Sequence, residues 1–404
     1  MAERSDVTRS WAYALVFAGA LLLVAALLLP TFLLNRLEKT PLDLRITTIA
    51  VTDGSTGSVA ETASVLTPSA KYKVDENVPL VSQRFLTTEE PSNADKVTIQ
   101  AGSSLRRTDV TGNTGLLTAT VDRVTLDRKS GEAIQDPVGS IQTDADGAFT
   151  EVEHHGLLWR FPFDTEKKTY DFFDLNIRTA NPIDFVEETE INGTKVYKFQ
   201  QTIAPTKVSD HVDSPINRVT KTVENWDIAP KAGETPETPV TMDRYYTNVR
   251  TIWVEPRTGT VIKGSEAPHQ YFARDANSGV EKTLLNGELA YDEETVENQI
   301  HTAKDATDTI SLVSRTVPII LGVLGILALL AGLFLGLRGK PSAGGRRRAG
   351  SGPSGVPAVT TPEADDEPAT EVFERPNLDP ATDVIRRPDI DPPTEEIRRP
   401  NLEK

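Results

Sequence analysis

The chain has 404 residues, a formal net charge of −16 and no cysteine. The absence of cysteine excludes disulfides, thiolate catalysis and Cys-ligated metal sites. The excess of acidic residues argues against a nucleic-acid partner, because binding to phosphates needs a basic face. Much of the Leu, Ala and Val is concentrated in two blocks, and the rest of the sequence is polar, so we expect a membrane protein.

The first apolar block covers residues 11–34 and contains no charged residue. It is longer than the roughly 20 residues that cross the hydrocarbon core, and Trp11 and Tyr13 open it, as is typical of the membrane interface. A cleavable signal peptide is the alternative. Its small-x-small site should end the block, whereas Ala18-Gly19-Ala20 lies in the middle. We therefore predict an uncleaved transmembrane helix after a short N-terminus, residues 1–10.

The second apolar block predicts a transmembrane helix over residues 316–337. It contains a GxxxG pattern at Gly332 and Gly336, which would let a second helix approach in a helix–helix dimer. The alternative is that glycine is simply common in membrane helices. Positive residues mark the cytoplasmic side, and a basic cluster follows directly, with Arg338, Lys340, Arg346, Arg347 and Arg348. We expect both termini in the cytoplasm and residues 35–315 outside it.

The outer segment, residues 35–315, predicts a β-rich (α+β) domain with antiparallel sheets or a barrel. Residues 42–49 alternate apolar with polar side chains, and similar strand-like runs occur at 96–100, 117–126 and 245–254. Asn192-Gly193 between two such runs predicts a tight hairpin. Gly131 and Gly259 occupy similar positions in two further turns, and residues 292–315 predict a membrane-proximal helix that leads into the second span.

Catalytic motifs are absent from the sequence, which has no HExxH, no Walker loop and no Gly-x-Gly-x-x-Gly. We therefore predict no enzyme and no cofactor. His154 and His155 are adjacent, so on a strand they would face opposite sides and not share a metal ion. No metal site is predicted.

Aromatic residues are dense between positions 159 and 173. Trp159, Phe161 and Phe163 alternate with other residues, so on a strand their rings would face one side. The simpler interpretation is a hydrophobic core. The functional one is a groove for a lipid or acyl chain, with these candidate ligand-binding residues: Trp159, Phe161, Phe163, Tyr170 and Phe172.

The C-terminal region has a composition that does not bury enough apolar surface to fold. Residues 338–369 form a basic and then Gly/Pro-rich linker, and residues 370–404 hold three copies of a 12-residue repeat. Each repeat has a threonine with an apolar residue three positions later, at Thr370 and Phe373, Thr382 and Ile385, and Thr394 and Ile397. Phosphothreonine at this spacing resembles what forkhead-associated domains recognise, which predicts docking of cytoplasmic partners. Replication slippage is the equal alternative.

An ordered set of motifs is similar to one known family. The matching pieces lie at residues 121–131, 156–163, 168–174 and 193–199, and around Gly259. They resemble the actinobacterial two-span family called domain of unknown function 3068, which is also labelled porin PorA. The resemblance implies an actinobacterial envelope protein, here expected in the plasma membrane, and brings no catalytic site.

These observations lead to three hypotheses about function. The first is a non-enzymatic envelope protein whose outer domain binds an apolar or cell-wall ligand, with lipid binding or transfer as its task. Its architecture is similar to that of the eukaryotic scavenger-receptor class, at the level of topology. The second is a scaffold or signalling protein with protein contacts alone. The third is a porin, although the strand-like runs lack the outward apolar faces of a spanning barrel.

Overall fold

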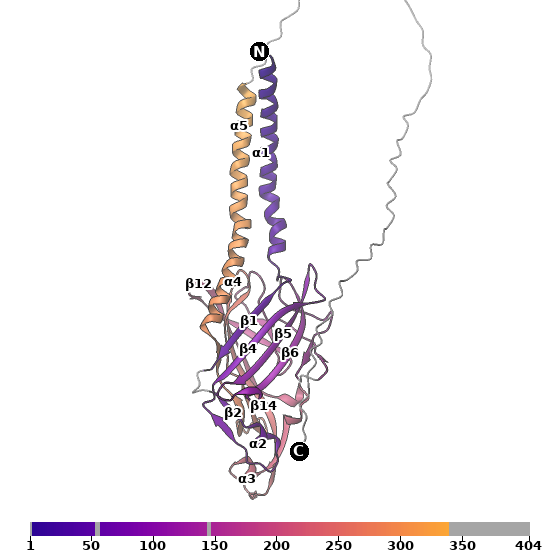
Figure 1. The fold of residues 1–404 in the computed structure, drawn as a ribbon, viewed down its shortest axis with the longest axis vertical. Helices are drawn as coiled ribbons and strands as arrows, with labels where there is room; N and C mark the ends of the chain where they lie inside the picture. Colours follow the sequence, from indigo (N-terminus) through magenta and orange to yellow (C-terminus); the bar gives the residue numbers. More distant parts are fainter. Residues whose placement is uncertain (1, 53–56, 144–146, 339–404) are drawn as a thin grey trace, which may run out of the picture. The chain divides into compact units, whose positions relative to one another are not determined.

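A computed structural model of the chain describes residues 2–52, 57–143 and 147–338. Two long helices, α1 (Ala2–Leu37) and α5 (Val317–Arg338), lie side by side and flank a β-rich domain in the sequence (Figure 1). Both helical segments are long and apolar enough to cross a membrane. Their leucines and valines are largely exposed in the isolated chain, as expected for side chains that face lipid.

Helix α5 continues a third helix that packs on the β-rich domain. This helix, α4 (Glu293–Ser311), begins at Asp292, whose carboxylate accepts a hydrogen bond of 2.8 Å from the backbone N–H of Thr295. It passes through one π-helical turn, η4 (Leu312–Thr316), into α5. One face of α4 is buried against the domain in a cluster with Val196 and Ile262.

Glycines bring α1 and α5 into close contact. A Cβ atom at Gly332 would lie 2.8 Å from Val16 Cγ2 and 2.9 Å from the carbonyl oxygen of Ala12. Gly19 and Gly325 meet in the same way further along the pair. Small residues therefore allow the two backbones to approach, as is common between membrane helices.

The strands of the domain and its short helices follow in chain order. The first part contains β1 (Arg45–Val51), β2 (Ser58–Ala60), α2 (Thr62–Leu66), β3 (Val74–Glu76), β4 (Leu80–Glu89), β5 (Lys96–Arg107), η1 (Gly112–Gly115), β6 (Leu116–Asp127), β7 (Ala133–Ile134), β8 (Ser140–Gln142) and β9 (Thr150–Glu151). The second part contains β10 (Tyr170–Asp174), β11 (Thr179–Ile191), β12 (Thr194–Lys207), η2 (Val208–Asp210), η3 (Pro215–Asn217), β13 (Arg218–Thr222), α3 (Val223–Trp226), β14 (Pro239–Glu255), β15 (Thr260–Glu266), β16 (His269–Ala273), β17 (Lys282–Asn286) and β18 (Leu289–Tyr291).

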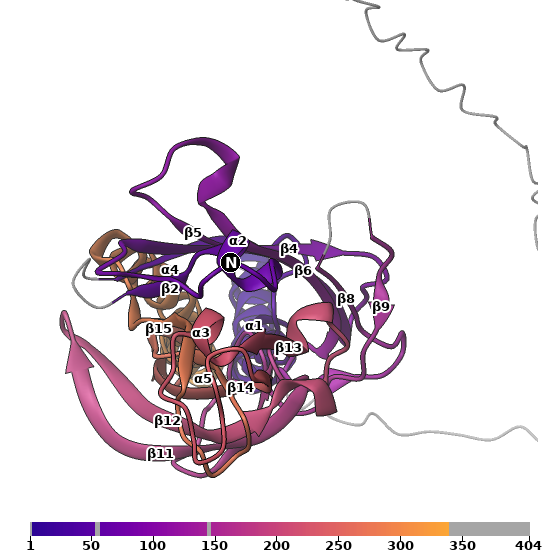
Figure 2. The same cartoon turned by 90° about the horizontal axis from the view of Figure 1, so that it is seen from below.

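The named strands pair antiparallel throughout, which confirms the predicted antiparallel fold. One group joins β1, β4, β5, β6 and β8, and the other is organised around β14, which pairs with β12, β13, β15 and β16. The two groups face one another (Figure 2) and are linked through β18, which pairs with both β1 and β15. At the opposite side, among the described residues, only isolated bridges at Leu157 connect β10 to the region of β7, so the sheet does not close into the barrel that was the alternative prediction.

The predicted turns have the backbone conformations that their residues favour. Asn192 and Gly193 have φ values of 46° and 75° and connect β11 to β12, which confirms the hairpin. Gly131 and Gly259 have φ values of 74° and 71° in the turns after β6 and β14. The predicted strand at 42–49 begins slightly later, since β1 covers Arg45–Val51.

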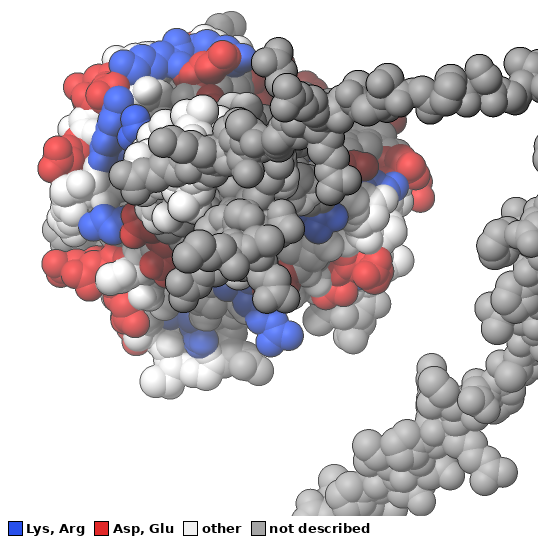
Figure 3. Space-filling model, turned by 90° about the horizontal axis from the view of Figure 1, so that it is seen from above, with Lys and Arg blue, Asp and Glu red and all other residues white. Residues whose placement is uncertain are grey.

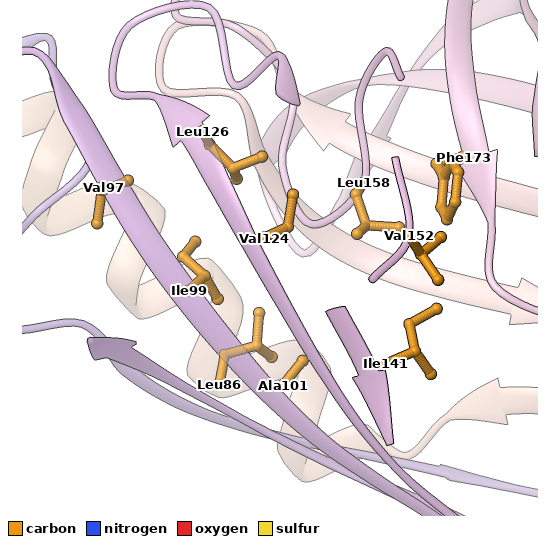
Figure 4. Close-up of a cluster of buried hydrophobic side chains, with 10 residues drawn as sticks. All are labelled: Leu86, Val97, Ile99, Ala101, Val124, Leu126, Ile141, Val152, Leu158 and Phe173. Atoms are coloured by element: carbon orange, nitrogen blue, oxygen red, sulfur yellow. The ribbon is translucent and has the colours of Figure 1, made fainter. Parts of the chain in front are cut away.

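The largest core cluster lies between the first strand group and the segment that follows β9 (Figure 4). Its side chains come mainly from β4, β5, β6, β8 and β10, with these members: Leu86, Val97, Ile99, Ala101, Val124, Leu126, Ile141, Val152, Leu158 and Phe173. The alternation along β5 and β6 directs one side chain in two inward, so each strand contributes a row of aliphatic groups.

Polar contacts join the end of α1 to the domain. Arg160 donates hydrogen bonds to Thr40 Oγ1 at 2.7 Å and to the carbonyl oxygen of Thr258 at 2.5 Å. Arg257 forms an ion pair of 2.7 Å with Glu38. Burial lowers the pKa of Arg160 to about 10, so its guanidinium keeps its charge at neutral pH. Seen from the side of the helices, basic and acidic residues are interspersed around this end of the domain (Figure 3).

Candidate ligand-binding cavity

A cavity of about 100 Å³ lies between the two strand groups. It is bordered by β1 and β4 on one side, by β14, β15 and β18 on the other, and by residues of the aromatic region. Its main apolar lining consists of Trp159, Phe172, Phe173, Ile252, Leu289 and Tyr291. A single water occupies about 10–15 Å³ of such a volume, so the cavity has room for several waters or for the end of an acyl chain.

An ion network of two buried side chains, Arg250 and Asp174, and the partly exposed Glu266 lies at one wall of the cavity. Arg250 on β14 lies 2.9 Å from Asp174 on β10 and 3.1 Å from Glu266 on β15. Its third partner is Gln201, whose side-chain oxygen accepts a hydrogen bond from Arg250. Asp174 also accepts a hydrogen bond of 3.0 Å from Tyr246, so both carboxylates and the guanidinium are paired.

The charges of this network stabilise one another. Burial alone would lower the pKa of Arg250, but the carboxylates of Glu266 and Asp174 raise it above its ordinary value. Burial alone would raise the pKa of Glu266, but the guanidinium of Arg250, followed by that of Arg84, lowers it. Arg250 and Glu266 therefore both stay ionised at neutral pH.

A second arginine lines the cavity from β4. The guanidinium of Arg84 lies over the ring of Trp159, with 4.8 Å between its central carbon and the ring centroid. Its Nε lies 3.4 Å from Ser103 Oγ, which is long for a hydrogen bond. This side of the cavity thus combines an aromatic face with a cation.

The predicted aromatic residues divide between the cavity and the core. Trp159 and Phe172 line the cavity. Phe161 is fully buried and packs on Phe199 with 4.7 Å between ring centroids, and Tyr170 meets both rings edge to face. Phe163 lies against the guanidinium of Arg160 at 4.4 Å, away from the cavity. Two of the five predicted residues therefore come together at one site.

The predicted strand through Trp159, Phe161 and Phe163 was wrong, because this segment has no regular structure. Its backbone is held by the turn after β14, where the Phe161 N–H donates to the carbonyl oxygen of Gly259 at 3.0 Å. Pro162 has no N–H to contribute to a strand ladder. The three rings therefore point to different surroundings, and the alternation in sequence does not bring them to one face.

Several residues of the site were missed from the sequence, although a signal existed for one of them. In the strand predicted at 245–254, positions 246, 248, 250, 252 and 254 share a face, and all five are buried. Arg250 is a charged residue on this inward face, which marks a buried ion pair. Arg84, Glu266 and Tyr291 carry no comparable pattern, because none of them is a charged residue on a fully buried strand face.

The two adjacent histidines occupy different surroundings. His154 is fully buried, with Nε2 2.8 Å from Asp122 Oδ1 and Nδ1 2.9 Å from the carbonyl oxygen of Val152. His155 is exposed. Within the described ranges no group of three or more His, Asp or Glu side chains has the geometry of a metal site.

Two other predicted interaction sites stay predictions. The tail residues Thr370, Phe373, Thr382, Ile385, Thr394 and Ile397 lie outside the described residues. The Gly332 face contacts α1 of the same chain, and Gly336 lies beside Ala12. This packing gives both glycines a role within one chain, and dimerisation through them is untested.

The fold defines a class of membrane protein in which two apolar helices flank an antiparallel outer domain. A family model described as Porin PorA matches residues 11–334, which include most of both helices and the whole domain. The chain belongs to this family, and it is therefore a membrane protein of the cell envelope.

Two relatives are similar to most of the chain. One, named Porin PorA, from Corynebacterium resistens, is 31% identical over 399 residues, covering 80% of this chain and 95% of the relative. Another of the same name, from Corynebacterium amycolatum, is 29% identical over 378 residues, covering 80% of this chain and 97% of the relative. The similarity thus extends over almost the full length of both relatives.

Proposed function

We propose that the outer domain binds an apolar ligand, such as a lipid or acyl chain, in the cavity between the two strand groups, and that it does so without catalysis. The observation that supports this best is the lining itself. Trp159, Phe172 and Phe173 provide apolar surface, while Arg84 and Arg250 provide polar groups at defined positions. An apolar cavity with few convergent polar groups is typical of ligand sites.

The size of the cavity limits what enters it. Its 100 Å³ accommodates the end of one chain and not a whole two-chain lipid. The rest of such a ligand would lie outside the cavity, or the strand groups would separate on binding.

Mass spectrometry of small molecules that copurify with the full chain tests the proposal. Ala50 on β1 lines the cavity, so Ala50→Phe should fill it and reduce the copurified lipid several-fold. Ala204→Phe is the matched control, because Ala204 lies exposed on β12 and does not line the cavity. Equal amounts of lipid with both variants, or none with the unmodified chain, would refute the proposal.

We also propose that both termini lie in the cytoplasm and that the helices cross the plasma membrane. The basic cluster after α5 supports this orientation. Because the chain has no cysteine, single cysteines can report it directly. In intact cells without an outer barrier, Ser209→Cys should react with a membrane-impermeant maleimide and Ser354→Cys should not. The opposite pattern would reverse the topology.

The repeats of the tail support a proposal for its task. Three threonines in register would dock phosphothreonine-reading proteins, and three copies would raise the effective concentration for binding. Phosphopeptide mapping in native membranes tests this, with Thr370, Thr382 and Thr394 all changed to Val as the negative control. Unmodified threonines would leave slippage as the explanation of the repeat.

The name of the relatives supports a second candidate function, passage of solutes as a porin. One chain offers two helices that pack closely through glycines, so they enclose no lumen. A pore would therefore require several copies of the chain. Conductance of the purified chain in planar bilayers tests this function, and conductance that Ala50→Phe leaves unchanged would favour it over ligand binding in the cavity.

A further inference from the structure

The cavity presents a cation, Arg84, that contacts no carboxylate directly among the described residues, although the charge of Glu266 acts on it from further away. No carboxylate forms an ion pair with Arg84 in the part of the chain that the structure describes, and its one hydrogen bond is the long contact from Nε to Ser103. The terminal nitrogens of this guanidinium therefore keep their donors available at the cavity wall. By contrast, the second arginine of the cavity, Arg250, is bound by two carboxylates.

A second donor on the same wall also lacks an acceptor. The indole N–H of Trp159 is buried and has no hydrogen-bond partner among the described residues. The ring of Trp159 is the one over which Arg84 lies, so the two side chains are neighbours. A buried donor without a partner costs free energy, and an acceptor bound in the cavity would remove that cost.

The acidic side chains near these donors are already engaged. Both oxygens of Glu266 lie close to Arg250, at 3.1 Å and 3.4 Å, and Asp174 is bound by Arg250 and Tyr246. The site has two arginines and two carboxylates, and both carboxylates are bound to Arg250. Arg84 is therefore the group to which a ligand anion would bind. The carboxylate of Glu266 disfavours a doubly charged ligand next to it.

We infer that the cavity binds the carboxylate of a single-chain amphiphile, a fatty acid, with Arg84 and the indole N–H of Trp159 holding the head and the apolar lining holding the first part of the chain. A carboxylate only accepts hydrogen bonds and fits the two parallel donors of a guanidinium. This inference rests on the proposed ligand-binding function and adds the chemistry of the ligand to it.

Photo-crosslinking with two matched probes tests the inference on the full chain in lipid vesicles. One probe is a medium-chain fatty acid with a diazirine on a carbon close to the carboxylate, and the other is its methyl ester, which has the same chain and no charge. Mass spectrometry then maps the labelled peptides. We expect the acid to label peptides that contain Phe172 or Leu289 about tenfold more than the ester does.

Variants separate the role of the charge from that of the cavity. Arg84→Gln should make labelling by acid and ester equal. Arg123→Gln is the matched control, because Arg123 also lies over an aromatic ring, Phe149, at 5.4 Å, and does not line the cavity. Trp159→Phe keeps an aromatic ring beneath Arg84 and removes the N–H, so it should reduce the preference for the acid about threefold. If Arg84→Gln does not fold, Trp159→Phe still tests the assignment of the carboxylate.

The outcomes distinguish the inference from the function on which it rests. If neither probe labels the cavity peptides of the unmodified chain, both the ligand-binding function and the inference are wrong. If both probes label them equally, the function stands and the carboxylate assignment is wrong. A preference for the acid that persists in folded Arg84→Gln, or that Arg123→Gln removes equally, would also overturn the assignment.

Discussion

Arg250 and Asp174 form an ion pair of 2.9 Å in which both side chains are buried, one on β14 and one on β10. These strands are separated by β11 and β12, so the pair ties together segments far apart in the chain. Breaking a buried pair by removing one partner leaves an uncompensated charge in a medium of low polarity. This relationship makes Arg250 a structural residue as well as part of the cavity wall.

Replacing Arg250 by methionine should therefore destabilise the domain strongly. We expect Arg250→Met to lower the free energy of unfolding by about 3–5 kcal/mol, because Asp174 and Glu266 lose their partner. Arg218→Met is the control, since Arg218 is 72% exposed and its removal should change stability by about 0.5 kcal/mol or less. Urea unfolding of the full chain in detergent, followed by tryptophan fluorescence, measures both. Similar losses for the two variants would contradict the role of the buried pair.

Glu266 should make stability depend on pH in the acid range. Its pKa in the folded chain is lowered, against the effect of burial, by Arg250 and Arg84, and in the unfolded chain it returns to about 4.3. Between these two pKa values the unfolded chain binds more protons than the folded chain does. The contribution of Glu266 to the free energy of unfolding is therefore fully present above the unfolded pKa. It is lost as the pH falls through the folded pKa.

Unfolding at a series of pH values measures this contribution. Glu266→Gln should weaken the dependence of the free energy of unfolding on pH between about pH 5 and about pH 3, relative to the unmodified chain. Glu237→Gln changes an exposed glutamate and should leave that dependence as it was. The attribution would be wrong if the two variants had the same pH profile.

The contact between α1 and α5 predicts a specific disulfide. A Cβ atom at Gly336 would lie 3.9 Å from Cβ of Ala12, within the range of about 3.5–4.5 Å found across disulfides. Since the chain has no cysteine, the double variant Ala12→Cys, Gly336→Cys contains only these two thiols. Mild oxidation should cross-link them within one chain.

Gel mobility and thiol labelling report the product. We expect a species of monomer size whose thiols no longer react with a maleimide. Ala12→Cys paired with Gly322→Cys is the control, because nothing lies within 4 Å of a Cβ at Gly322. A disulfide-linked dimer as the main product would show instead that the glycine face meets a second chain, as the GxxxG pattern had suggested.

Local sequence patterns predicted the fold well because strands and turns depend on near neighbours. The alternation at 245–254 became part of β14, and Asn192-Gly193 became the turn between β11 and β12. The apolar blocks became α1 and α5 for the same reason, since hydropathy is a local property. Such patterns do not show how the two strand groups are placed against one another.

The cavity depends on that missing information. Arg84, Trp159 and Glu266 lie more than 70 residues apart in the chain and meet only because β4 and β15 face one another across the aromatic segment. The alternation of Trp159, Phe161 and Phe163 was misleading, because Gly259 holds this segment in an irregular conformation. The turn at Gly259, which was correctly predicted, thus holds residues 159–163 in a conformation that was not predicted.

Replacing Gly259 by alanine should consequently destabilise the domain more than the same change at Gly193, a glycine of similar conformation. The φ of 71° at Gly259 disfavours any L side chain, and a Cβ there would also collide with the carbonyl oxygen of Phe161. Gly193 has a φ of 75° and no atom within 4 Å of a Cβ, so it shares the strain without the collision. We expect unfolding free energies lower by about 1 kcal/mol for Gly193→Ala and about 3 kcal/mol for Gly259→Ala.

The substitution at Gly259 should also affect the ligand site, because the segment that contacts Gly259 includes Trp159, which lines the cavity. If Gly259→Ala shifts this segment, the indole moves relative to Arg84, and the variant should bind fatty acid more weakly at a temperature where it is still folded. Gly193→Ala should bind as the unmodified chain does, since its hairpin does not border the cavity. Photo-crosslinking with the acid probe, at matched folded fractions, measures this difference. Equal labelling of the two variants would mean that the turn at Gly259 stabilises the domain without positioning Trp159.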